Sequence, residues 1–79
     1  MYKEVLSLLD EINHRLRISE DEVLDVESYK PGSRRLYRIV VRRKKDGSII
    51  PWSEWLSYSE LRAALQLAMR LLRYMDSHK

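Results

Sequence analysis

The segment at residues 35–43, RLYRIVVRR, restricts the fold more than any other part of the sequence. It is rich in β-branched and aromatic residues, which favour extended strands. It is followed by Asp46-Gly47, a dipeptide typical of the tight turn between two antiparallel strands. We therefore predict a β-hairpin over residues 34–55.

The register of this hairpin depends on its loop. If Asp46 and Gly47 are the whole loop, the cross-strand pairs are Lys45 with Ser48, Arg43 with Ile50, Val41 with Trp52 and Ile39 with Glu54. One face then carries Tyr37, Ile39, Val41, Ile50 and Trp52, and the other carries Arg38, Val40, Arg42, Lys44, Ile49 and Trp55. A longer loop shifts the register by one residue and exchanges the faces of the second strand. Pro51 cannot donate a ladder hydrogen bond, so we expect this strand at a sheet edge.

Amphipathic helices are predicted on both sides of the hairpin. In the first, over about residues 2–17, apolar side chains recur at the spacing of one helix face, at Tyr2, Val5, Leu6, Leu9, Ile12 and Leu16. The second spans about residues 59–76. Ser57 or Ser59 is its expected N-cap, with Ser59 the better placed.

Residues 20–29 fit two kinds of structure. Ser19 and Glu22 have the S-x-x-E spacing of a capping box, which predicts a short helix from Glu20. Apolar and acidic residues alternate from Leu24 onward, which favours a strand instead. Both interpretations stay open, with the strand preferred.

These elements predict a small single α+β domain over residues 1–79, in the order α-β-β(-β)-α. A chain of 79 residues buries only about 60% of its unfolded surface, which gives it one modest core. We expect a two- or three-stranded antiparallel sheet packed against the N- and C-terminal helices. The predicted core residues are Leu6, Leu9, Ile12, Tyr37, Ile39, Val41, Trp52, Leu61, Leu65, Ala68 and Leu72.

The sequence offers no recognisable catalytic or cofactor motif. It contains no cysteine and only two glycines, Gly32 and Gly47, so it has neither a thiolate zinc motif nor a glycine-rich phosphate loop. Neither His14 nor His78 has a partner at metal-ligand spacing. We expect no enzymatic activity, no cofactor and no metal. The apolar stretch at residues 61–74 is interrupted by polar side chains and no signal peptide is evident, so we expect a cytoplasmic or nucleoid-associated protein without membrane contact.

Charge is strongly segregated along the chain, although the net charge is only +3. Residues 19–28 contain five acids and no base, and residues 29–45 contain eight bases and no acid. Arginine donates a planar fork of hydrogen bonds to phosphate, and tryptophan stacks on bases. We therefore predict nucleic-acid binding, to DNA or RNA, by the hairpin. The expected contacts are Arg34, Arg35, Arg38, Arg42, Arg43, Lys44, Lys45 and Trp55.

Other interpretations of the basic run remain. The arginines fit the solvated outer face of a half-buried sheet, and the acidic segment at residues 20–27 can neutralise the hairpin as a neighbouring strand or helix. The basic surface also fits an acidic protein partner.

The last helix is apolar over most of its circumference. Its polar residues Arg62, Gln66, Arg70 and Arg73 occupy an arc of only roughly 80°. Arg62, Arg70 and Arg73 form a possible second basic stripe. The wide apolar surface is either covered on two sides within the domain or used in a homodimer, which we expect, through Leu67, Leu71 and Tyr74. The alternative function is accordingly a small interaction module, an adaptor or a phage- or virus-type inhibitor of a host complex, that docks through this helix and its Trp and Arg residues.

The order helix, strand, hairpin, helix resembles that of double-stranded-RNA-binding domains. The similarity covers Val5 to Leu72, with residues 37–41 as the middle strand and Ser59-Glu60-Leu61 opening the last helix. That family has a lysine cluster where this chain has Ser59-Glu60-Leu61-Arg62, and the histidine of its first loop has no match near Pro31-Gly32. The resemblance therefore implies an order of elements and no site residues.

Overall fold

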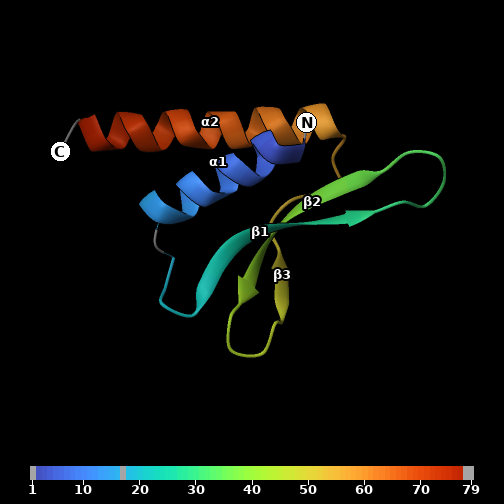
Figure 1. The fold of residues 1–79 in the computed structure, drawn as a ribbon, viewed down its shortest axis with the longest axis horizontal. Coiled ribbons are helices and arrows are strands. Elements are labelled where there is room, and N and C mark those ends of the chain that lie inside the picture. The colour runs from blue at the N-terminus through green and yellow to red at the C-terminus, as the bar shows by residue number, and fades with distance from the viewer. Residues whose placement is uncertain (1, 17, 78–79) are drawn as a thin grey trace.

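A computed structural model describes residues 2–16 and 18–77. Five elements follow one another along the chain (Figure 1): α1 (Tyr2–Arg15), β1 (Glu22–Tyr29), β2 (Leu36–Arg43), β3 (Ile49–Pro51) and α2 (Tyr58–Ser77). The predicted α+β class, with an antiparallel sheet packed against the N- and C-terminal helices, is confirmed. Arg17, at the expected end of the first helix, and His78 lie outside the described residues.

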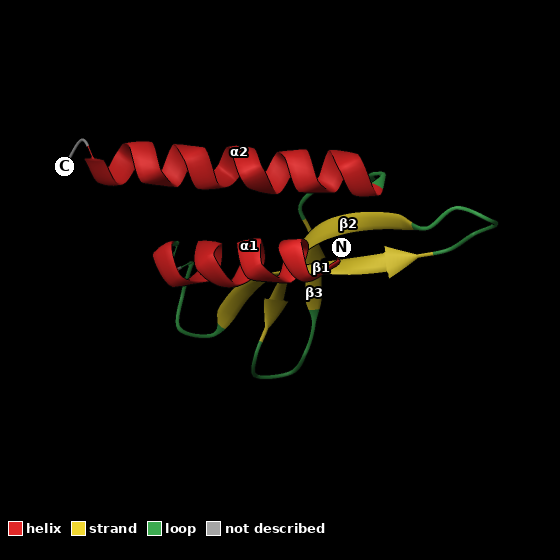
Figure 2. Ribbon diagram, turned by 45° about the horizontal axis from the view of Figure 1, so that its top comes forward, coloured by secondary structure: helices red, strands yellow, loops and turns green. Residues whose placement is uncertain are grey.

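The sheet has three antiparallel strands in the order β1-β2-β3. Both helices lie on the same side of it, with α1 against β1 and α2 against β2 (Figure 2). The two helices also pack on each other, and α2 extends beyond the sheet at its carboxyl end (Figure 1). One face of the sheet is therefore covered by a helical layer. Neither of the described helices covers the other face, where Val40 is nevertheless fully buried and Arg38 lies over the Trp55 ring.

The acidic segment at residues 22–29 is a strand. Every residue from Glu22, opposite Arg43, to Tyr29, opposite Leu36, pairs with β2. The Ser19 hydroxyl does donate to the Glu22 carboxylate, at 3.0 Å, but this contact closes a tight turn before the strand. The long ladder with β2 satisfies more backbone groups than a short helix would, and it prevails over the local capping signal.

The predicted hairpin register was wrong by two residues. Val41 lies opposite Ile50, and the loop covers residues 44–47. The Lys44 and Lys45 N–H groups donate to the Asp21 backbone and carboxylate oxygens, at 2.7 and 3.0 Å, and are thus drawn out of the ladder with β3. Gly47 adopts a positive φ of 74°, as the turn requires. Because the shift is an even number of residues, each side chain keeps its predicted face.

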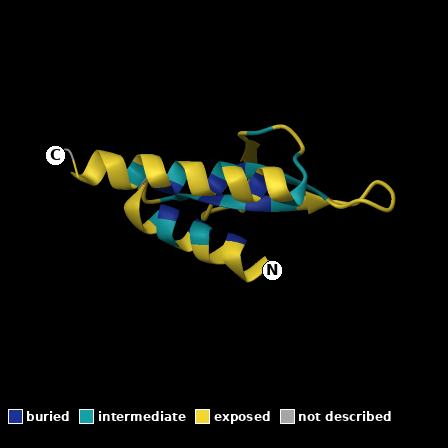
Figure 3. Cartoon of the chain, turned by 90° about the horizontal axis from the view of Figure 1, so that it is seen from above, coloured by how far each residue is buried: buried dark blue, intermediate teal, exposed yellow. Residues whose placement is uncertain are grey.

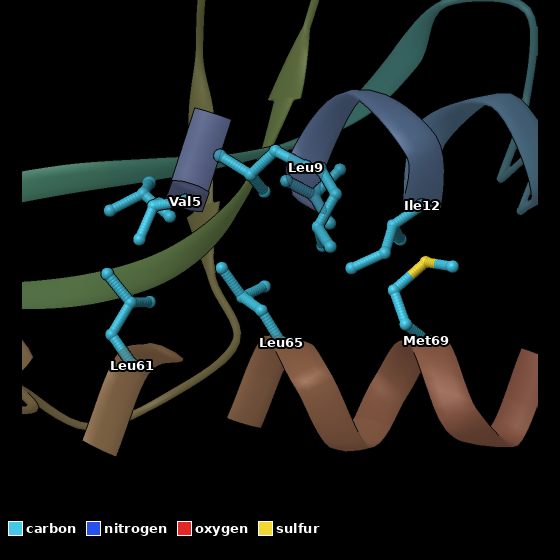
Figure 4. Packing of buried hydrophobic residues seen from close by; sticks show 9 residues of the cluster. Val5, Leu9, Ile12, Leu61, Leu65 and Met69 are labelled. Carbon is cyan, nitrogen blue, oxygen red and sulfur yellow. The ribbon is translucent and has the colours of Figure 1, made fainter. Parts of the chain in front are cut away.

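The core lies between the two helices and the sheet (Figure 4). Its buried residues are Val5, Leu9 and Ile12 from α1, Leu61, Leu65 and Met69 from α2, and Leu24, Val26 and Val41 from the sheet. The predicted core members Tyr37, Ile39, Ala68 and Leu72 are partly buried against this cluster.

Two predicted core residues were wrong. Leu6 is 51% exposed and Trp52 is 58% exposed. Val5 faces the core, and Leu6 is one residue further round the helix. Neither helix packs on β3, so no helix covers the ring of Trp52, which follows this strand.

Ser57, and not Ser59, caps α2. The Ser57 hydroxyl accepts the Glu60 N–H at 3.2 Å, and the Glu60 carboxylate accepts the Ser57 N–H at 2.9 Å, which completes a capping box. The hydrogen bonds from Ser57 hold the pKa of Glu60 below its ordinary value of 4.5. Ionised Glu60 therefore contributes stability above that value, and the contribution is lost as the pH falls through the lowered pKa.

The cap yields a prediction about stability. Ser57→Ala is expected to lower the free energy of unfolding by about 1 kcal/mol, because it leaves an N–H of the first helical turn without its side-chain acceptor. The pKa of Glu60 is expected to rise only part of the way to its ordinary value in the same variant, because the backbone N–H of residue 57 still donates to the carboxylate. Urea unfolding and an NMR titration of Glu60 measure the two effects. Ser59→Ala is the matched control, and an equal loss in that variant would contradict the assignment of the cap.

Candidate interaction surfaces

The arginines inside the predicted hairpin strand are paired with acids of the neighbouring strand. Arg38 lies directly opposite Glu27, and its Nε donates to the Glu27 carboxylate at 2.6 Å. Arg42 forms an ion pair with Asp25. The acidic and basic segments of the sequence thus neutralise each other across the β1–β2 ladder.

Trp55 also lies beside this pairing. The Arg38 guanidinium lies over the indole ring, 4.4 Å from its centroid, and the Tyr29 ring lies 5.4 Å away at a tilt of 45°. A cation over the face of tryptophan is attracted by the ring quadrupole. One face of the ring is therefore occupied by Arg38, which leaves Trp55 less suited to stack on a base than the sequence suggested.

The remaining bases of the predicted site divide between two ends of the sheet. Arg34 and Arg35 lie in the loop after β1, and Arg43, Lys44 and Lys45 lie at the β2–β3 turn. The two groups are separated by the eight-residue strand β2, about 25 Å in length (Figure 1). None of the five forms an ion pair within residues 2–16 and 18–77. Lys44, predicted on the same hairpin face as Arg38 and Arg42, belongs to the turn instead.

In the second predicted basic stripe, Arg62, Arg70 and Arg73, two of the three arginines form ion pairs between α2 and α1. Arg62 pairs with Glu4 at 2.7 Å, and Arg73 pairs with Glu11 at 3.3 Å. Of the three, only Arg70 has no ion pair in the described part of the chain. The stripe lies in the helical layer, across the sheet from Arg38 and Arg42, so the two basic sets do not form one surface.

The apolar side chains predicted to meet a partner are exposed. Leu67, Leu71, Tyr74 and Met75, called the α2 stripe below, are between 55% and 62% exposed. The buried residues Leu61, Leu65 and Met69 recur every four residues and occupy another side of the helix. Figure 3 shows the same division of α2 into buried and exposed parts. Neither the sheet nor α1 covers the α2 stripe, so the domain does not use this surface for its own core.

A further contact was not foreseen from the sequence. The Asn13 side chain donates to the Leu24 carbonyl and accepts the Leu24 N–H, both at 2.8 Å. It attaches α1 to the outer edge of β1. An asparagine on the polar side of a helix gives no sequence signal for such a contact, because its partner is a backbone group eleven residues away.

Other kinds of site are not found in the described residues. Within residues 2–16 and 18–77, no group of three or more histidine, aspartate or glutamate side chains is placed to hold a metal ion. In the same part of the chain, no helix is both long and apolar enough to cross a membrane. No family model, curated protein or solved structure matches the chain.

The cross-strand pair yields a prediction that a double-mutant cycle tests. Arg38 and Glu27 side chains are only 26% and 25% exposed, so their hydrogen-bonded pair is expected to couple by about 1 kcal/mol. The cycle combines Arg38→Met with Glu27→Gln in urea unfolding. The more exposed Arg62–Glu4 pair, treated likewise, is the control and is expected to couple by less than about 0.5 kcal/mol. Equal coupling energies would contradict a special role for the β1–β2 pair.

Proposed function

We propose that the protein is a non-catalytic interaction module that pairs α2 with the same helix of a second copy. The observation that supports this most is the α2 stripe, four large apolar side chains that are each more than half exposed on one helix. Contiguous exposed apolar surface is costly in a monomer and is typical of protein contact sites. This proposal takes up the homodimer expected from the sequence. The exposed stripe supports it better than the paired arginines support nucleic-acid binding by the sheet face.

The spacing of the stripe favours a helix as its partner. Three residues of the stripe, Leu67, Leu71 and Tyr74, follow Ala64 at intervals of three, four and three residues, which is the a and d spacing of a coiled-coil seam. A second copy presents the same seam when it is related by a two-fold axis, so no further surface is required. At 20 residues, α2 extends about 30 Å and supplies several turns of contact.

Self-association is the first test of this proposal. Sedimentation equilibrium at micromolar to sub-millimolar concentration is expected to show a dimer for the natural chain. Leu67→Glu combined with Leu71→Glu is expected to give a folded monomer, since both side chains are exposed and the charges oppose pairing. The control carries the same two substitutions on the polar arc, Gln66→Glu with Arg70→Glu, and is expected to remain dimeric. A monomeric natural chain, or a dimer that survives the first variant, would contradict the proposal.

Nucleic-acid binding is a second candidate function, because one group of basic side chains is not neutralised by the sheet. Arg43, Lys44 and Lys45 project from the β2–β3 turn without ion-pair partners in the described residues. Such a turn is able to contact phosphates even though Arg38 and Arg42 are paired. The contact is electrostatic, so it carries no preference for sequence.

For this candidate we predict that the affinity for nucleic acid depends on salt, and that the basic residues at the β2–β3 turn cause this dependence. Fluorescence anisotropy with labelled duplex DNA, duplex RNA and single-stranded DNA is expected to show affinity that falls with salt. Replacing Arg43, Lys44 and Lys45 by Ala is expected to flatten the slope of log K against log salt by about 2 to 3, because each phosphate contact contributes about 0.9 for duplex DNA. Arg38→Gln with Arg42→Gln, which keeps a hydrogen-bond donor opposite Glu27 and near Asp25, is the control. It is expected to leave the slope unchanged, once circular dichroism shows that the variant is folded. Absence of binding at low salt would eliminate this candidate.

A further inference from the structure

β1 is an edge strand, and part of its outer edge is open. In β2, Tyr37 and Arg43 direct their backbone N–H and C=O groups toward the β3 side. The even-numbered residues of β2, from Leu36 to Arg42, therefore form the hydrogen bonds to β1. By the register, the β1 residues that receive these bonds are Val23, Asp25, Glu27 and Tyr29. Leu24, Val26 and Ser28 therefore direct their N–H and C=O groups away from the sheet.

The chain itself occupies some of these groups. Asn13 takes both backbone groups of Leu24, in the way that a peptide group of another strand would. The Val26 N–H donates to the carboxylate of Asp25 at 2.8 Å. Among the described residues, the Val26 carbonyl and both backbone groups of Ser28 have no hydrogen-bond partner. The open part of the edge thus begins where the contact of Asn13 ends.

The free groups match a parallel strand. In a parallel ladder, one added residue donates to the carbonyl before its opposite residue and accepts the N–H after it. The Val26 carbonyl and the Ser28 N–H flank Glu27 in this way. An antiparallel strand opposite Ser28 also uses both backbone groups of that residue, so the hydrogen bonds fit either direction. The charge at the end of the edge distinguishes the two directions.

A cationic pocket lies at the end toward which a parallel strand runs. It has a volume of about 350 Å³ and is lined by Tyr2, Ser28, Arg35 and Tyr37. One guanidinium nitrogen of Arg35 donates to the Ser28 hydroxyl at 3.2 Å, and its other nitrogens have no partner in the described residues. Arginine binds carboxylate through paired N–H donors. A segment added parallel to β1 therefore brings its carboxyl end to Arg35.

Apolar side chains of α1 border the same edge. Tyr2, Leu6 and Asn13 share one side of the helix, four and seven residues apart. Asn13 reaches β1 at Leu24, and the Tyr2 ring stacks on Tyr37, which lies opposite Ser28. Leu6 lies between them along the helix and is half exposed. Side chains of an added strand that lie opposite Val26 and Ser28 point to this helical side of the sheet.

We propose that the open edge of β1 binds the apolar carboxyl-terminal segment of a peptide as an added parallel strand, with the terminal carboxylate on Arg35. The ligand class is an extended peptide with apolar residues at its last and third-last positions. The site is separate from the α2 stripe and does not depend on dimer formation.

The test uses two synthetic peptides and the full chain. The first is an acetylated hexapeptide that alternates lysine and valine, ends in valine and has a free carboxylate. The second is identical but ends in a carboxamide. NMR titration of the ¹⁵N-labelled protein is expected to shift and protect the Ser28 amide most, and the carboxylate peptide is expected to bind roughly 10-fold more tightly, as a charge-assisted hydrogen bond predicts.

Two variants locate the carboxylate. Arg35→Gln is expected to abolish the preference for the carboxylate peptide, while Arg34→Gln, one residue away in the same loop, is expected to keep it. The Leu67→Glu, Leu71→Glu variant is expected to bind both peptides as the natural chain does, which separates this site from the proposed α2 pairing. Lack of binding, equal affinity for the two peptides, an unchanged preference in Arg35→Gln, or shifts confined to β3 or α2 would each overturn the proposal.

Discussion

The pairing of an acidic strand with a basic strand is the interaction on which the rest of this structure depends. β1 and β2 align over eight residues, so Glu27 lies opposite Arg38 and Asp25 comes within reach of Arg42. Like charges on neighbouring strands repel, and unlike charges stabilise the same register. Once that register is set, Leu24 and Val26 on β1 share the inner face with Val41, and the two helices acquire an apolar surface to cover. The charge segregation of the sequence therefore stabilises the pairing of β1 with β2.

The helical layer follows from how little surface this sheet offers. β3 has only three residues and packs on neither helix, so only β1 and β2 support the helical layer. These two strands carry α1 and one side of α2, but they do not cover the rest of a 20-residue helix. Ion pairs from Arg62 and Arg73 to acids of α1 fix the side on which the helices meet. The opposite side of α2 carries the α2 stripe, which stays more than half exposed. The exposure of these side chains is a consequence of the architecture, since no rotation of α2 buries both its inner face and the stripe.

Local patterns predicted most of the elements, while contacts between distant residues decided what the patterns left open. Periodicity identified both helices and the hairpin strand, and it placed Leu9, Ile12, Leu61 and Leu65 in the core. The capping box at Ser19 was misleading because β2 offered β1 a longer ladder than any local helix. The hairpin register changed because Asp21, far from the turn in sequence, captures the backbone of Lys44 and Lys45. For the candidate site, the sequence identified the exposed leucines but not the partners of Arg38 and Arg42, since a charge run does not show which acid lies across the ladder.

The two edges of the sheet are protected to different degrees, and this bears on how the molecule meets other chains. At the β3 edge, the strand is very short and Pro51 removes one donor, both of which discourage pairing with another strand. At the β1 edge, Asn13 closes the position of Leu24, but among residues 2–16 and 18–77 no side chain bonds the backbone of Ser28 in the same way. The open segment lies on the α1 side of the molecule, whereas the α2 stripe lies on the side of α2 that faces away from α1. Because the core separates these two surfaces, occupation of one leaves the other free, and the fold is able to hold a paired helix and an added strand at the same time.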